Sequence, residues 1–172
     1  MPKQTKHAGF TLIECLVVIS IIAILTAMAV PSFRQFKDHA QQLQVIYQLQ
    51  AAVLMARHLS IVEQRAVLIC PARAGTAMEK SRSPACDENY SEGVALWTEQ
   101  ATGWRLRRVW QWSSTTLTNR RGNRKVSEAV AFNTQGLANR NLTWSTCVAQ
   151  GNLSLVLNRV GRPDIRRQWG VC

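Results

Sequence analysis

One apolar run constrains this chain more than any other feature of its sequence. The 21 residues 10–30 contain a single charged side chain, Glu14, and are long enough to cross about 30 Å of hydrocarbon as a helix. Lys3 and Lys6 precede the run, so we predict one membrane span, with the residues that follow it outside the cytoplasm. The alternative is a secretory signal peptide cut after Ala29, but Glu14 inside the run argues against it.

Glu14 is a candidate functional residue. A carboxylate within a membrane helix is costly and marks a functional site by default. Its side chain either reaches back to the nearby interface or pairs with a cation on a neighbouring copy of the chain. A terminal amine on Phe10, released by cleavage between Gly9 and Phe10, would supply such a cation.

The residues around this position resemble a known family. Gly9-Phe10-Thr11-Leu12-Ile13-Glu14, with an apolar helix that leads to Pro31, is similar to the prepilin leader of type IV pilins and type II secretion pseudopilins. The resemblance implies that a prepilin peptidase cleaves after Gly9 and N-methylates Phe10. It also implies that Glu14 neutralises the terminal amine of an adjacent subunit during assembly. Residues 1–9 would then be the leader peptide and residues 10–30 the transmembrane helix.

The helical pattern continues beyond Pro31. Apolar residues recur at spacings of three and four, which predicts an amphipathic helix over residues 31–62 that Pro31 and Ser32 kink rather than end. The buried face is expected to hold Ile46, Leu49, Val53 and Ala56, and the other faces Gln41, Gln42, Gln44, Gln48 and Arg57. A long N-terminal helix, half in the bilayer and half against a head domain, is the plan of a pilin.

Residues 63–172 have the pattern of strands and form the predicted head. Short apolar runs predict strands at 65–70, 93–98, 104–112, 129–133, 142–147 and 153–157. Glu99–Gly103 is expected to be a five-residue hairpin turn. The strand after it is expected to place Trp104, Leu106, Trp110 and Trp112 on one face, Arg105 and Arg107 on the other, with a bulge at Arg108. The predicted fold class is α+β, a long N-terminal helix packed on a small antiparallel β-sheet head.

The head also resembles one branch of the family, the FimT and FimU minor pilins and the GspH pseudopilins. The similarity rests on Cys70-Pro71, Cys86, Gly93–Trp97, Val130–Gly136, Cys147, Val160-Gly-Arg162 and Cys172. Four cysteines in a domain predicted to lie outside the cytoplasm favour disulfides, for which three pairings are possible. The favoured pairing joins Cys70 to Cys86 and Cys147 to Cys172, closing loops of about 16 and about 25 residues that contribute about 3 kcal/mol each.

The sequence contains no recognisable catalytic or metal-binding pattern. His7, His39 and His58 are far in sequence from any candidate nucleophile, and no P-loop, G-x-G-x-x-G or H-E-x-x-H motif is present. The sequence has no C-x-x-C pair of the kind that binds zinc. Cys15 is expected to act as a small apolar residue in the membrane. We therefore expect a protein that is not an enzyme and that uses no cofactor or metal.

The charge balance points to anionic partners. The chain has 21 Lys and Arg against 10 Asp and Glu, a formal net charge of +11. In the head the basic residues fall into three groups, which are Arg105, Arg107 and Arg108; Arg120, Arg121, Arg124 and Lys125; and Arg159, Arg162, Arg166 and Arg167. They form either a solvated surface, or one complementary to another subunit, or a nucleic-acid surface in which arginines near Trp169 hold phosphates.

The resemblance makes the last group a candidate DNA-binding site. FimT-like minor pilins of competent bacteria bind incoming DNA through a Gly-Arg-x-Arg motif in the C-terminal tail. This chain has Gly161-Arg162-Pro163-Asp164, with an aspartate in place of the second arginine. Arg166 and Arg167 follow closely and could substitute for it, so Arg159, Arg162, Arg166 and Arg167 are the candidate DNA-binding residues.

The first interpretation of the whole chain is a minor pilin, a non-catalytic, membrane-anchored subunit that joins a type IV pilus and helps to initiate it. The second is a GspH-type pseudopilin of a type II secretion system. The third is a DNA-binding minor pilin for natural transformation. All three imply a single-pass protein of the bacterial inner membrane with a periplasmic head. The expected partners are prepilin peptidase, other pilins or pseudopilins, the inner membrane and, in the third interpretation, DNA without sequence specificity.

We predict cleavage between Gly9 and Phe10 and methylation of Phe10, because the polar leader meets the apolar segment there. The intact mass of the membrane-extracted protein tests both modifications. A mature chain that starts after Ala29 would contradict the pilin interpretation.

Overall fold

The computed structural model describes residues 11–72, 80–81, 83–148 and 151–172 of the 172-residue chain. Its longest element is helix α1, Leu12–Val62, which continues through Pro31. Two compact units share this helix. The first ends at Asp38, and the second is His39–Cys172.

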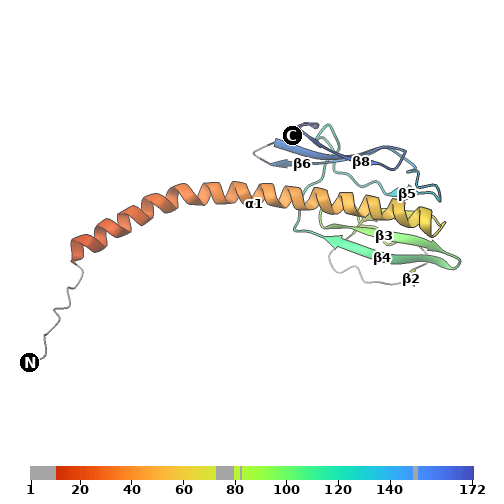
Figure 1. The fold of residues 1–172 in the computed structure, drawn as a ribbon, viewed down its shortest axis with the longest axis horizontal. Coiled ribbons are helices and arrows are strands. Elements are labelled where there is room, and N and C mark those ends of the chain that lie inside the picture. The colour runs from red at the N-terminus through yellow and green to blue at the C-terminus, as the bar shows by residue number, and fades with distance from the viewer. Residues whose placement is uncertain (1–10, 73–79, 82, 149–150) are drawn as a thin grey trace, which may run out of the picture. The chain divides into compact units, whose positions relative to one another are not determined.

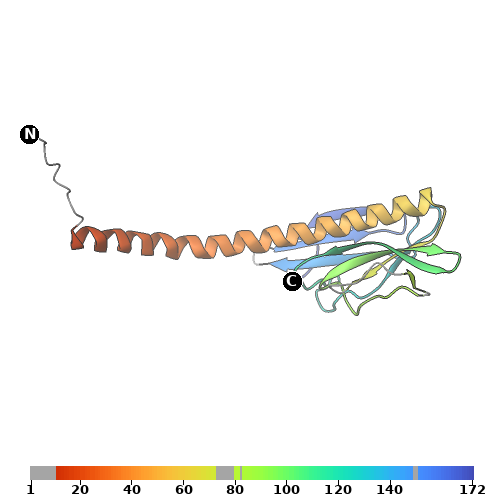
Figure 2. The ribbon, with the colours of Figure 1, turned by 90° about the horizontal axis from the view of Figure 1, so that it is seen from below.

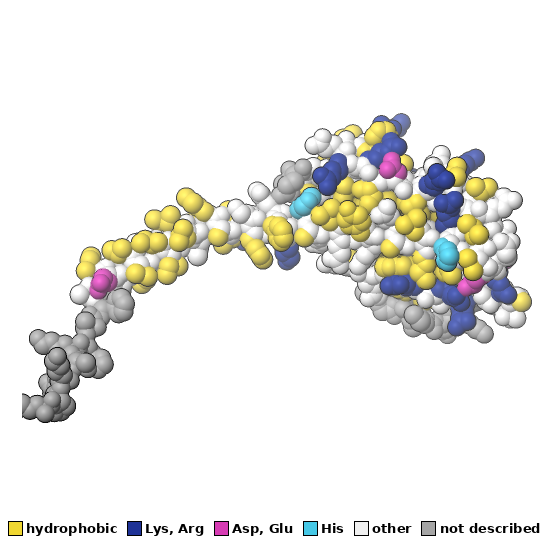
Figure 3. Space-filling view, in the orientation of Figure 1, with side chains coloured by type: hydrophobic (Ala, Val, Ile, Leu, Met, Phe, Trp, Pro, Cys, Tyr) yellow, Lys and Arg dark blue, Asp and Glu magenta, His cyan; other side chains and the backbone are white. Residues whose placement is uncertain are grey.

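The first unit is an uncovered apolar helix. Every described side chain from Thr11 to Asp38 is exposed, and Figure 3 shows hydrophobic side chains along this segment. A window of this helix has a mean hydropathy of 2.6, and none of that window is buried. By length and composition the segment can cross a membrane.

The second unit contains two antiparallel sheets beside the remainder of α1 (Figure 1, Figure 2). The five-stranded sheet has the order β2-β4-β3-β1-β5, with β1 Val67–Pro71, β2 Lys80–Ser81, β3 Gly93–Gln100, β4 Gly103–Gln111 and β5 Val130–Phe132. The three-stranded sheet has the order β6-β7-β8, with β6 Leu142–Val148, β7 Gly151–Leu157 and β8 Pro163–Arg167. The predicted α+β fold is confirmed, whereas strands β2 and β8 were not predicted.

The main core joins α1 to both sheets. Leu49 and Val53, on the predicted apolar face of the helix, are fully buried with Leu96 of β3 and Trp144 of β6 in one cluster. Gln42 was expected outside this face, but it is buried. Its Nε2 donates hydrogen bonds to the carbonyl oxygens of Thr146 (3.0 Å) and Gly151 (3.2 Å). A buried amide is tolerated because carbonyls at the β6–β7 end satisfy it.

The hairpin of β3 and β4 is tighter than predicted. Pairing continues to Gln100 opposite Gly103, so the turn contains only Ala101 and Thr102, and the expected five-residue turn is wrong. Gly103 has a φ of 137°, a conformation that glycine adopts without a steric penalty. This freedom allows Glu99 to remain in the ladder opposite Trp104.

The bulge in β4 lies one residue earlier than predicted. Leu96 pairs with Arg108 and Trp97 pairs with Leu106, which leaves Arg107 as the extra residue. Beyond the bulge, alternate side chains of β4 therefore point to the opposite face of the sheet. The expectation that Trp104, Leu106, Trp110 and Trp112 share one face is wrong. Trp104 and Leu106 pack with the second core cluster around Trp97, whereas Trp110 and Trp112 belong to the main core.

Two of the segments that carry the resemblance to minor pilins, Val130–Gly136 and Val160–Arg162, meet at the turn between β7 and β8. Gly161, between β7 and β8, has a φ of 77°, and a Cβ there would lie 2.3 Å from the carbonyl oxygen of Gly136. The amide of Ala138 also donates to the carbonyl oxygen of Arg159 (2.9 Å). A side chain at Gly161 would separate the two segments, so this glycine has a packing role.

Candidate functional site

Glu14 lies in the first turn of α1 and takes part in its N-terminal cap. The backbone N–H and the Oγ1 of Thr11 donate to Glu14 Oε2 (3.0 and 3.1 Å), and the Glu14 N–H donates to Thr11 Oγ1 (3.3 Å). This reciprocal pair is a capping box, which the sequence Thr-x-x-Glu signals and which our sequence analysis missed. Within the described residues Oε1 of Glu14 accepts no hydrogen bond. Gly9 and Phe10, the predicted processing residues, lie outside the described residues.

The first basic group lies at the bulge in β4. Arg107 forms an ion pair with Glu63, just beyond the end of α1. The guanidinium of Arg108 lies over the ring of Trp110, with 4.9 Å between Cζ and the ring centroid. Arg105 is exposed. The three side chains therefore have different surroundings.

The second group lies in the loop 119–125, here called the basic loop. Arg120, Arg121 and Arg124 are exposed, and Arg124 forms an ion pair with Glu128. Partial burial pushes the pKa of Glu128 upward, but N–H donors of Ser127 and of Glu128 itself, together with Arg124, outweigh it. The pKa of Glu128 is therefore lowered and its carboxylate remains charged.

The candidate DNA-binding residues lie on an ordered turn and strand. Arg159 and Arg162 are exposed in the turn between β7 and β8, where the Arg162 N–H donates to Asn158 Oδ1 (3.0 Å). Arg166 and Arg167 belong to β8, an edge strand that pairs with β7. Arg167 is exposed, but Arg166 is half-buried and its Nε donates to Asp164 Oδ2 (2.7 Å). The aspartate that departs from the family motif thus engages one of the candidate arginines.

The structure brings together two basic groups that the sequence separates. The guanidinium carbons of Arg120 and Arg166 lie over the ring of Trp169, at 4.1 and 4.3 Å from its centroid. Both distances are within the range of a cation–π interaction. The adjacency of Trp169 to the tail arginines was visible in the sequence, but the contact with Arg120 had no local signal.

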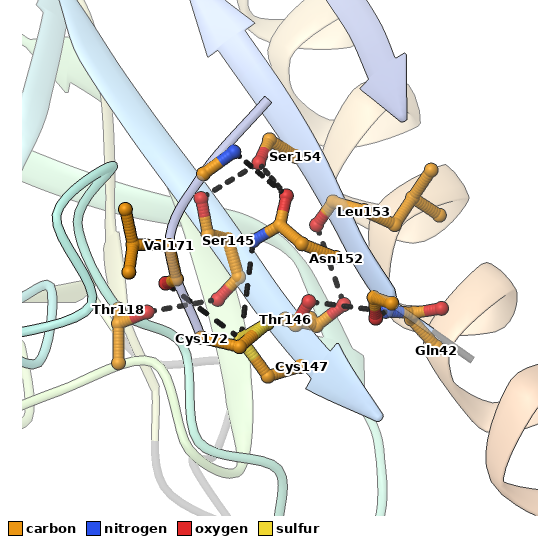
Figure 4. Close-up of a disulfide and its surroundings, with 12 residues drawn as sticks. Gln42, Thr118, Ser145, Thr146, Cys147, Asn152, Leu153, Ser154, Val171 and Cys172 are labelled. Atoms are coloured by element: carbon orange, nitrogen blue, oxygen red, sulfur yellow. Dashed lines mark hydrogen bonds between the residues drawn. A yellow bond between two sulfur atoms is a disulfide. The ribbon is translucent and has the colours of Figure 1, made fainter. Parts of the chain in front are cut away.

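Residues 168–172, here called the tail, are fixed across the end of the three-stranded sheet. A disulfide joins Cys147 of β6 to Cys172, with 5.6 Å between the Cα atoms (Figure 4). The Gly170 N–H donates to Asn152 Oδ1 (3.1 Å), and the Gln168 N–H donates to the carbonyl oxygen of the same asparagine (2.8 Å). A second disulfide joins Cys70 to Cys86, so both pairs are the ones favoured from the sequence.

A buried polar network lies beneath the tail. The hydroxyls of Ser145 and Ser154 are 2.7 Å apart, and Ser154 Oγ donates to Asn152 Oδ1 (2.8 Å), as Figure 4 shows. A Cβ on Gly170 would lie 2.7 Å from Asn152 Nδ2 and 3.1 Å from Ser145 Oγ. The tail therefore fits this network closely.

An open groove runs beside the basic loop. Its volume is about 810 Å³, and most of its lining residues are polar or charged: Asn119, Arg120, Arg121, Asn123, Arg124, Glu128, Asn141, Leu142, Thr143, Val156, Leu157 and Asn158. Within the described residues no cluster of three His, Cys, Asp or Glu side chains could hold a metal ion. The groove instead offers amide and guanidinium donors to an anionic or hydroxylated ligand.

Comparison with known proteins adds two findings. Residues 4–30 match the prokaryotic N-terminal methylation motif. The fold is similar to the crystal structure of the Pseudomonas aeruginosa type IV minor pilin FimU in two crystal forms. In the first the TM-score is 0.54 at 18% identity, covering 76% of this chain and 92% of that chain. In the second crystal form the TM-score is 0.52 at 17% identity, and the match covers 72% of this chain and 91% of that chain.

These findings join a methylation motif at the start of a long helix to a head whose fold is similar to that of FimU. No curated protein sequence matches the chain significantly.

We predict that Cys172→Ser lowers the free energy of unfolding of the head by about 2–5 kcal/mol, because the disulfide restricts the unfolded chain. Hydrogen exchange in the tail should also become faster, because the bond that holds Cys172 to Cys147 is lost. Thermal unfolding and hydrogen exchange of the detergent-purified chain measure both effects. Cys15→Ser is the matched control, since Cys15 is a free cysteine and its thiol can be removed without breaking a bridge. Free alkylation of all four head cysteines in the unreduced protein would contradict the prediction.

Proposed function

We propose that this protein is a minor pilin, a non-catalytic subunit that is processed after Gly9, methylated on Phe10 and built into a type IV pilus, where it helps to initiate assembly. The observation that carries the proposal is the methylation motif over residues 4–30 joined to a head with the fold of a minor pilin. In this proposal residues 10–30 anchor the chain in the bacterial inner membrane and the head lies in the periplasm. Prepilin peptidase and the other pilins of the fibre are its partners.

The geometry at the start of α1 supports a role for Glu14 in assembly. The capping box uses only Oε2 of the carboxylate and leaves Oε1 without a hydrogen bond within the described residues. A charged carboxylate surrounded by apolar, exposed helix is costly in a membrane unless a cation pairs with it. We infer that Oε1 receives the methylated terminal amine of a neighbouring subunit.

The same features suit a GspH-type pseudopilin of a type II secretion system. Both assemblies require the leader, the anchor helix and a folded head, so the two proposals differ in the apparatus and not in the subunit. Deletion of the gene distinguishes them. Loss of surface pili with normal protein secretion supports the pilus, and loss of secretion with normal pili supports the pseudopilus.

We predict that Glu14→Gln still inserts in the membrane but loses at least about tenfold in fibre incorporation, equivalent to about 1.4 kcal/mol. The amide keeps an oxygen for the capping box and removes the charge, so the loss reports the amine pairing. Immunoblots of sheared-fibre and membrane fractions measure incorporation. Thr11→Ala is the matched control, because it removes the cap hydroxyl and keeps the carboxylate. Normal incorporation of Glu14→Gln would show that Glu14 serves only as a cap.

Nucleic-acid binding is a second candidate function, favoured by the placement of Arg159, Arg162 and Arg167. All three are exposed, on an edge strand and its turn, and none forms an ion pair within the described residues. The formal net charge of +11 attracts a polyanion to this surface. Phosphate contacts carry no sequence information, so DNA would be bound without sequence preference.

We predict that the full chain in a neutral detergent binds labelled duplex DNA with an affinity that falls steeply with salt. The log–log slope is expected to be about −0.9 for each phosphate neutralised. Fluorescence anisotropy over a salt series measures it, with two unrelated duplex sequences as a test of specificity. Absence of binding even at low salt would remove this candidate and leave the fibre subunit unaffected.

A further inference from the structure

We propose that the basic loop and the tail, with Arg166, form one composite site for the phosphate groups of nucleic acid, held in shape by the Cys147–Cys172 disulfide. The proposal rests on the second candidate function above and assigns its site. It differs from the sequence expectation, which placed the site in the last arginine group alone.

The centre of the composite site is Trp169. Arg120 and Arg166 both lie over its ring, so one indole orients two guanidinium groups. Arg166 uses Nε for Asp164 and retains its two terminal nitrogens, and Arg120 donates no side-chain hydrogen bond within the described residues. Stacked guanidiniums keep their N–H edges available for bidentate bonds to phosphate. Because the stacking already orders both side chains, binding costs less conformational entropy.

The basic loop and the tail are packed without spare room. The Val171 N–H donates to the carbonyl oxygen of Arg120 (3.0 Å), which fixes the backbone of the arginine beside Trp169. Gly122 has a φ of 70°, and a Cβ there would lie 2.5 Å from the carbonyl oxygen of Val171. The tail therefore fixes the position of Arg120. The tail is in turn held by its hydrogen bonds to Asn152 and by its disulfide to Cys147.

The anchors lie on both sides of Trp169. Gln168 and Gly170 bond to Asn152, and Cys172 is joined to Cys147. Figure 4 shows the tail crossing the strands that carry these partners. Release of Cys172 would free the segment that bonds to Arg120, although every arginine would remain in the chain. The disulfide is thus a positioning element of the site.

The charges favour a polyanion over a single anion. Arg120, Arg121 and Arg166 carry three positive charges against the one carboxylate of Asp164, and Arg124 is partly neutralised by Glu128. Arg120 and Arg166 contact the same ring, so their like charges repel each other, and an anion bound beside them relieves that repulsion. The groove of about 810 Å³ continues from Arg120 and Arg121 with amide donors, which gives room for successive phosphates.

The chemistry of Trp169 selects the backbone rather than the bases. Two arginines already cover its ring, so we expect no base stacking and a similar affinity for duplexes of any sequence. Guanidinium edges in pairs match phosphate oxygens better than the scattered carboxylates of an acidic protein surface. Polyglutamate is therefore a suitable competitor with which to separate the two kinds of partner.

The test uses the full chain in neutral detergent and a fluorescein-labelled duplex of about 30 base pairs. Arg120→Gln with Arg166→Gln should reduce the magnitude of the salt slope by about 2 and weaken binding at least about tenfold at low salt. The matched control is Arg105→Gln with Arg108→Gln, which removes the same charge from β4, in the other sheet. It should leave the slope nearly unchanged.

Cys172→Ser tests the positioning role, because it keeps every arginine. We expect its binding to fall to within about threefold of the double arginine variant, together with faster hydrogen exchange in the tail. Cys15→Ser should bind like the wild type. Wild-type affinity of Cys172→Ser with a released tail would overturn the role of the disulfide.

The remaining outcomes separate this proposal from the two functions proposed above. Equal, small losses for the two arginine pairs would show a diffuse basic field and overturn the composite site, while DNA binding itself would stand. Displacement of the duplex by polyglutamate at equal charge concentration would also overturn it. Incorporation of the same variants into fibres is measured separately, so failure here leaves the minor-pilin proposal intact.

Discussion

The head depends on one interaction, the burial of one face of α1 against both sheets. Leu49 and Val53 share a core with Leu96 and Trp144, so the helix connects two sheets that have no strand in common. A three-stranded sheet of this size needs a packed face to be stable. The helix supplies that face for β6 and β7, and it thereby fixes the strand that carries Cys147.

A second constraint acts at the end of the three-stranded sheet. The tail crosses the sheet, bonds to Asn152 and is joined to Cys147, which places Trp169 between a loop and a strand that are far apart in sequence. The basic character of the surface is a matter of composition. The meeting of Arg120 and Arg166 at Trp169, on which the proposed composite site rests, depends on these few anchors.

The sequence predicted the helix and most strands because their signals are local. Periodicities of three to four and of two were sufficient to predict α1 and the presence of the two strands of the β3–β4 hairpin. Thr11 with Glu14 also carried a capping signal that the sequence displays. The faces of β4 could not be predicted from alternation, since a single extra residue at Arg107 reverses them. A bulge changes the register of a ladder without a characteristic residue to mark it.

The sequence by itself determined the membrane-length helix, the methylation motif and the α+β class, because each depends on residues that are neighbours along the chain. Only the tertiary structure decided that Gln42 is buried, and that Arg120 and Arg166 meet at Trp169. These contacts join segments that are far apart along the chain, and the distance between two segments in the sequence does not predict whether they meet in the fold. Packing of the helix, the sheets and one disulfide brings them together.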